Sequence, residues 1–182
     1  ATFTAFLVVP QLVKFYEKRT ILLTAIALAA LIPPIPILLF INGYLPAPGT
    51  WDLFFATIPF VYIANSSLSS SAIIRESMLG DISDEVELET HLGQQGLMYA
   101  SSSLIGKLNT GLGILMAGLA LEFIGFPQGS QITPSADHIF NLAMVQGPLV
   151  ALLMIIPFAI FSMYKIDRFK HQEIIAELEN RS

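Results

Sequence analysis

Four long stretches of this sequence carry almost no charge, and they limit what the chain can fold into. They cover residues 20–42, 52–74, 97–124 and 139–164. Each has the length of about 20 residues that a helix needs to cross the roughly 30 Å hydrocarbon core of a bilayer. In the whole chain 54% of the residues are hydrophobic and only 13% are charged, which is too apolar for an ordinary soluble domain. The sequence therefore predicts an all-α integral membrane protein with four full transmembrane helices.

A shorter apolar segment, residues 1–13, opens the chain without an initiator Met and without a positively charged leader. It is too short to span a bilayer and lacks the pattern of a signal peptide. We interpret it as the truncated end of a preceding transmembrane helix. Together with the four spans it forms one transmembrane unit over residues 1–182.

The basic residues lie on one side of the predicted spans. Eight of the nine Lys and Arg residues fall before the first span, between the second and the third, or after the fourth. The connections 42–51 and 125–138 contain none. Because cytoplasmic loops are enriched in Lys and Arg, we expect the loop 75–96 and the tail 165–182 to be cytoplasmic. This orientation predicts a multi-pass protein of the cell inner (plasma) membrane with a cytoplasmic C-terminus.

The predicted cytoplasmic loop 75–96 is acidic. An N-cap at Ser83 or Asp84 would begin a short surface helix within it. Its acids either pair with basic residues across the cytoplasmic face or remain a solvated charge run, since exposed ion pairs contribute only about 0 to 1 kcal/mol. The predicted gate residues are Asp81, Asp84, Glu85 and Arg75, with Lys14 and Arg19 as further counter-charges.

Prolines and small polar residues inside the spans indicate helix contacts. The three prolines between residues 33 and 36 remove backbone donors, so this span is predicted to kink or break. The bend either faces a cavity or is purely structural. In the next span, Asn65 is followed by serines between residues 66 and 71, which either pack against another helix or contact a substrate.

Lys107 is a charged residue deep inside the span 97–124. A lysine at the bilayer centre costs about 2.5 kcal/mol or more, so it marks a polar pathway by default. It shares a helical stripe with Ser103 and Gly111, and small residues on a stripe let another helix approach closely. We therefore expect Lys107 to point into the helix bundle. The alternative is that its side chain snorkels to the cytoplasmic interface, about 15 Å away.

Other classes of function lack the residues that they need. The chain has no Cys for disulfides or thiolate metal sites, and its three His residues fall in predicted loops or the tail. The spans contain no paired acids and no nucleophile with a base, so we expect neither an enzyme nor a metal site. A basic stripe that could bind phosphates is also missing, which argues against a nucleic-acid partner.

The region 78–127 carries motifs of a known family. They are MLGDISDE at 78–85, GLMYASSS at 96–103, Lys107, and GLALEFIGFP at 118–127. In order and spacing they resemble the glycoside-pentoside-hexuronide:cation symporter family, the melibiose-carrier-like branch of the major facilitator superfamily. The resemblance implies the C-terminal part of such a transporter, with 75–96 joining helices ten and eleven. Its main partner would be the missing N-terminal half of the same transporter.

The resemblance also implies secondary active transport, the cation-coupled symport of a sugar or similar small polar solute by alternating access in the lipid bilayer. Lys107 matches the lysine that this family carries in helix eleven, facing the central cavity and coupling the cation and substrate sites. We expect no cofactor apart from a coupling Na⁺ or H⁺. The residues predicted for substrate or ion coupling are Lys107, Ser103, Gly111 and Asn65.

Two alternatives remain open from the sequence. Related carriers in the same superfamily branch move lysophospholipid-like or other amphiphilic solutes, and a lysine at position 107 suits a phosphate or zwitterionic head group equally well. The other alternative is a small structural membrane subunit.

Overall fold

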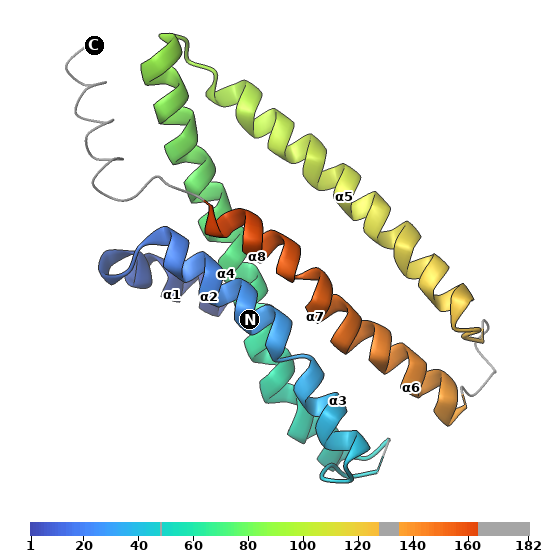
Figure 1. The fold of residues 1–182 in the computed structure, drawn as a ribbon. Coiled ribbons are helices and arrows are strands. Elements are labelled where there is room, and N and C mark those ends of the chain that lie inside the picture. The colour runs from blue at the N-terminus through green and yellow to red at the C-terminus, as the bar shows by residue number, and fades with distance from the viewer. Residues whose placement is uncertain (48, 128–134, 164–182) are drawn as a thin grey trace.

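The structure is a computed structural model that describes residues 1–47, 49–127 and 135–163. Every regular element in these ranges is helical (Figure 1). The elements in chain order are α1 Thr2–Phe15, α2 Lys18–Leu31, α3 Pro34–Ile41, α4 Trp51–Thr90, α5 Gln95–Phe123, α6 Ala136–Met144, the π-helix η1 Val145–Leu149, α7 Val150–Leu153 and α8 Ile155–Ser162.

Four helical stretches of the described chain are long and apolar enough to cross a membrane. They are Lys18–Ile41, Trp51–Thr90, Gln95–Phe123 and Asp137–Ser162, and α1 is a shorter apolar helix before them. The predicted fold class, an all-α membrane protein with four full transmembrane helices, is confirmed. The predicted tail 165–182 lies outside the described residues.

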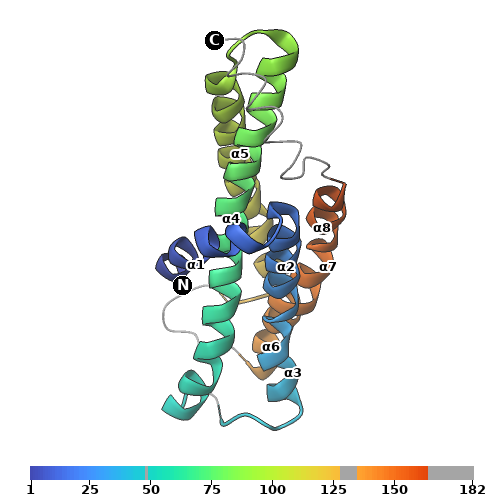
Figure 2. The ribbon, with the colours of Figure 1, turned by 90° about the vertical axis from the view of Figure 1, so that its left-hand side faces the viewer.

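Helix α2 lies at the centre of the packing. It contacts α4 on one side and α7 and α8 on the other, while α1 also packs on α4. Figure 2 shows α1 lying across α4. Burial of apolar side chains at these crossings forms a small core of Val9, Ile21, Leu22, Ile26, Ile74 and Met78.

The prolines interrupt the first membrane-length stretch, as their sequence position predicts. Helix α2 ends at Leu31, and α3 begins at Pro34 after a turn at residues 32 and 33. Proline lacks the backbone N–H for the helix ladder and its ring crowds the preceding turn. In the last stretch Pro148 lies inside the π-helix η1. Proline therefore lies at an interruption of the α-helix in both stretches, and α3 and η1 are in contact.

Helix α4 is longer than the sequence predicted. It runs without a break through 40 residues, so the segment 75–90 is helical rather than a loop. The prediction that a short helix starts at Ser83 or Asp84 is wrong, because both residues lie in the interior of α4. At 1.5 Å per residue α4 is about 60 Å long, twice the hydrocarbon thickness. One half of it must extend beyond the bilayer core.

Helix α5 stands apart from the other helices. It follows α4 after a short turn, and Figure 1 shows it diverging from α4 toward its far end. None of its residues is buried in the structure. A membrane-length helix with no buried residue leaves both faces available to lipid or to further protein.

Candidate functional site

Lys107 lies near the middle of α5, 12 residues after its first residue Gln95. That distance is about 18 Å along the helix axis, more than half of a bilayer core. Ser103 and Gly111 lie one turn before and after it, and all three residues are exposed. Within the described residues Lys107 has no hydrogen bond or ion pair. The structure thus presents an unpaired amine on a face of small residues.

Asp81 makes the strongest ion pair of the described chain. Both of its carboxylate oxygens accept hydrogen bonds from Lys18 Nζ, at 2.6 and 2.8 Å. Asp81 is 6% exposed, and the pair joins the start of α2 to the extended half of α4. A lysine in the first turn of a helix is unfavourable to the helix dipole, so the carboxylate also neutralises a charge at the wrong end of α2.

Lys18 was not among the cations that the sequence analysis named for these acids. Arg75 instead pairs with its neighbour Glu76 at 3.3 Å, and both side chains are about half exposed. Arg19 donates to the backbone carbonyl of Ser162 at the end of α8. The start of α2 therefore contacts both α4 and α8, and Lys18 is the basic residue there that pairs with Asp81.

The other predicted gate residues lie on the same half of α4. Asp84 Oδ1 accepts a hydrogen bond of 3.5 Å from Gln95 Nε2 at the start of α5. Glu87 accepts from the same amide at 3.4 Å. Glu85 is partly buried. The acidic end of α4 thus holds the turn into α5 on one side and the start of α2 on another.

A cavity of about 1030 Å³ lies between α4 and α5. Arg75 and Ser103 both line it, so the structure brings together two residues that the sequence assigned to separate sites. Lys107 and Gly111 are not among its lining residues. Asn65 donates its side-chain amide to the Val61 carbonyl of its own helix at 2.8 Å and is not placed beside Lys107 by any contact.

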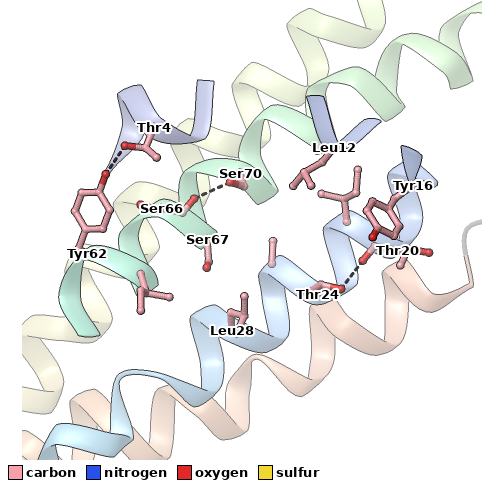
Figure 3. A pocket seen from close by; sticks show the side chains of 13 residues that line it. Thr4, Leu12, Tyr16, Thr20, Thr24, Leu28, Tyr62, Ser66, Ser67 and Ser70 are labelled. Atoms are coloured by element: carbon pink, nitrogen blue, oxygen red, sulfur yellow. Dashed lines mark hydrogen bonds between the residues drawn. The ribbon is translucent and has the colours of Figure 1, made fainter. Parts of the chain in front are cut away.

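A second cavity, of about 460 Å³, lies between α1, α2 and α4, and we call it the hydroxyl pocket (Figure 3). This pocket was not predicted from the sequence, although hydroxyl groups recur every four residues on α2 and again on α4. That spacing places them on one face of each helix. The residues with hydroxyl groups are Thr4, Tyr16, Thr20, Thr24, Tyr62, Ser66, Ser67 and Ser70, and apolar side chains complete the lining.

The described residues bring several kinds of polar group to these positions. Among the described residues no group of three or more His, Cys, Asp or Glu side chains is placed to hold a metal ion. The functional groups are a buried carboxylate with its lysine, an unpaired amine and a set of hydroxyls. These groups bind ions or polar solutes.

The family model for MFS/sugar transport proteins matches residues 1–168. This chain belongs to the MFS/sugar transport protein family. An uncharacterized symporter of Synechocystis sp. is 29% identical over 142 residues, which cover 76% of this chain and 26% of the symporter. The chain thus spans about a quarter of the length of that curated relative. No solved structure matches.

Family membership and the four membrane-length helices of the described residues make this chain a multi-pass membrane protein of the MFS/sugar transport type. Major facilitator proteins consist of two halves, and the substrate lies near the bilayer midplane between them. An amine near the middle of α5 is at the depth of such a site.

Proposed function

We propose that this chain belongs to a cation-coupled symporter that moves a sugar or similar small polar solute by alternating access. The motifs between residues 78 and 127 favour the melibiose-carrier-like branch. The relative described as a symporter supports coupling to a second solute, which would be Na⁺ or H⁺. The substrate is bound between this chain and the other half of the transporter.

The observation that carries the proposal is the amine of Lys107. It is charged, lies at mid-depth in a membrane-length helix and is not paired within the described chain. Leaving a charge unpaired in the bilayer core costs several kcal/mol, so a carboxylate or an anionic ligand group must face it in the complete transporter. In this proposal the small residues Ser103 and Gly111 leave room beside the Lys107 amine. Asn65 contributes a polar side chain to the same site from α4.

The acidic half of α4 is the proposed cytoplasmic gate. Asp81 fixes α4 to α2 through Lys18, which gives the gate a rigid base. Asp84, Glu85 and Arg75 lie on the same stretch of α4, and in this proposal they change partners as the two halves rock. The positive-inside distribution of Lys and Arg supports a cytoplasmic position for this end and for the C-terminus of an inner-membrane protein.

Replacing Lys107 by Ala in the full-length carrier tests the proposal. We expect uptake against a gradient to be abolished, because the coupling charge is lost, while insertion into the membrane is unchanged. The measurement is uptake of a panel of radiolabelled mono- and disaccharides into vesicles with an imposed Na⁺ or H⁺ gradient. Met116→Ala is the matched control, since Met116 lies on the opposite face of α5 and is exposed.

Uptake that survives in Lys107→Ala at the level of Met116→Ala would contradict the assigned role of the amine. If the unmodified carrier shows no gradient-dependent uptake of any sugar, the proposed function itself is contradicted. Dissipating one gradient at a time, with a sodium ionophore or a protonophore, identifies the coupling ion.

A further inference from the structure

The two membrane-length stretches that prolines interrupt are interrupted at the same depth. Helix α2 ends at Leu31, 13 residues after Lys18, and the π-helix η1 is centred on Gly147, 15 residues before Ser162. At 1.5 Å per residue these lengths are about 20 and 22 Å along the two stretches. Both are counted from the same end of the bundle, because Arg19 donates to the Ser162 carbonyl there. The two interruptions therefore lie level with each other.

The junction between α2 and α3 has an incomplete hydrogen-bond ladder. The prolines at positions 33 and 34 have no N–H, so the carbonyls four residues before them lose the donors of a continuous helix. Ile35 donates to the Ile32 carbonyl at 3.1 Å instead of to Leu31. The α-helical ladder is thus interrupted at the consecutive residues 33 to 35. A change of angle between α2 and α3 breaks no ladder bond at these residues.

The π-helix η1 is the corresponding junction in the last stretch. Pro148 lies inside η1 and removes one backbone donor there, while the Val150 N–H bonds the Gly147 carbonyl only three residues back. Helices change direction mostly at prolines and at single π-helical turns, and η1 contains both features. The helix on either side of η1 can therefore change its angle at this point.

The two junctions touch each other. Gly147 is buried, and a Cβ added to it would lie 2.6 Å from Ile37 Cδ1 and 3.5 Å from Pro34 Cα. Because glycine has no side chain, the backbone of η1 lies directly on the first turn of α3. A rotation of α3 about its junction with α2 therefore displaces η1, and a rotation at η1 displaces α3.

The helix ends on the basic side of the junctions are held together, and we call them the base. Lys18 of α2 bonds both carboxylate oxygens of Asp81 on α4, and Arg19 of α2 bonds the Ser162 carbonyl of α8. Phe161 of α8 packs against the apolar core. Every buried hydrophobic residue of the described chain lies on α1, on α2 or at residues 74 and 78 of α4. Ion pairing and apolar burial thus fix the base.

We propose that the turn at residues 32 and 33 and η1 form one shared hinge, about which α3 and α6 swing together while the base stays fixed. Helices α3 and α6 adjoin the connections 42–51 and 125–138, which contain no Lys or Arg and are predicted to face outward. The swing opens and closes this outer end. The inference rests on the proposed function, because alternating access requires an outer end that opens.

The test measures distances between pairs of spin labels in the full-length carrier, in nanodiscs and without substrate. Labelled cysteines at Ile41 on α3 and Ile139 on α6 report the two swinging helices, and those at Thr24 on α2 and Ile160 on α8 report the base. All four positions are exposed. Helix α3 is about 12 Å long, so a change of angle of about 20° moves its end by about 4 Å. We expect the 41–160 and 24–139 distance distributions to be broader than the 24–160 distribution by about this amount.

Replacing prolines stiffens the hinge. Pro33→Ala combined with Pro34→Ala returns two backbone donors and keeps the Cα that lies on Gly147. We expect the 41–160 distribution to narrow to the width of the 24–160 distribution, and the 24–139 distribution to narrow with it through the contact at Gly147. Pro148→Ala should narrow both from the other side. Pro59→Ala is the matched control, because Pro59 lies inside the continuous helix α4, and it should leave both distributions unchanged.

The distance between positions 24 and 160 reports whether each variant is folded. If the double variant loses this distance, Pro148→Ala alone decides the question. Distributions for α3 and α6 that are as narrow as the base pair in the unmodified protein would overturn the proposal, and so would proline variants that narrow one of them only. The readout needs no transport. A carrier without sugar uptake therefore contradicts the proposed function, whereas a rigid outer end in an active carrier contradicts the hinge.

Discussion

At the scale of single residues, the pair between Lys18 and Asp81 is the contact most sensitive to substitution. Lys18→Met removes the cation that bonds both oxygens of the Asp81 carboxylate, and Asp81 is only 6% exposed. We expect the free energy of unfolding to fall by about 2 to 3 kcal/mol, because a buried charge that loses its hydrogen-bonded partner is strongly destabilised. The measurement is the thermal unfolding of the full-length protein in detergent.

The control for this prediction is Arg75→Met, which removes an exposed pair with Glu76 and should change stability by less than about 1 kcal/mol. The double variant Lys18→Met with Asp81→Leu should recover much of the loss, since it leaves no charge unpaired. A single Lys18→Met variant as stable as the Arg75→Met variant would contradict the prediction.

Residues inside the spans were easier to single out from the sequence than ion pairs between helices. Lys107 stands out because a bilayer makes any charge within an apolar stretch expensive. Lys18 did not, because it lies in the same short basic segment as Lys14 and Arg19, and nothing local separates the three. Its pairing with Asp81 depends on the rotation of α2 against α4, 63 residues away in the sequence. Periodicity and composition do not contain that information.

At the scale of elements, hydropathy located the bilayer-crossing part of α4 but not its end. Apolar character falls at Arg75, where the helix leaves the predicted span, yet α4 continues to Thr90. It continues because Ile74, Met78 and Asp81 are buried against the preceding helices, and because the segment contains no proline after Pro59. Hydropathy therefore marks the limit of the membrane, whereas packing decides the limit of the helix.

The contact between α3 and η1 yields a prediction for an element. A Cβ added at Gly147 would lie 2.6 Å from Ile37 Cδ1 and 3.5 Å from Pro34 Cα. We expect Gly147→Ala to lower the free energy of unfolding by about 1 kcal/mol, because the end of the Ile37 side chain must move, whereas Pro34 Cα stays at an ordinary contact distance. Thermal unfolding of the full-length protein measures it. Gly96→Ala, where a Cβ meets nothing within 4 Å, should be neutral or slightly stabilising.

A Gly147→Ala variant that is as stable as Gly96→Ala would show that α3 and η1 separate at low cost. The two bent stretches would then be free to slide. If Gly147→Ala lowers the free energy of unfolding and adding Ile37→Val restores it, the close contact between α3 and η1 is supported. The smaller valine side chain leaves room for the new methyl group at residue 147.

At the scale of the whole molecule, the sequence predicted the number of membrane-length helices well and their arrangement poorly. Bilayer thickness fixes how long an apolar helix must be, so length and charge alone are sufficient to count spans. Lipid chains are as apolar as leucine, however, so hydrophobicity does not tell a lipid-facing side from a protein-facing one. That is why neither the separation of α5 nor the hydroxyl pocket was predicted, although the motifs identified the superfamily.

The direction of the whole chain in the membrane is the last prediction. Glu87 lies 13 residues beyond Ile74 on the same continuous helix, about 20 Å past the end of the predicted span. Gly49 lies in the connection at the opposite end of α4, which contains no Lys or Arg. In a cysteine-free background, to which these 182 residues contribute no cysteine, a cysteine at Gly49 should react with an impermeant maleimide added to intact cells. A cysteine at Glu87 should react only after the cells are opened, because about 60 Å of helix carries it through the membrane to the cytoplasmic side. The reverse labelling pattern would invert the topology and place the Lys18–Asp81 pair outside, whereas labelling of both positions from outside would show that α4 does not cross the bilayer.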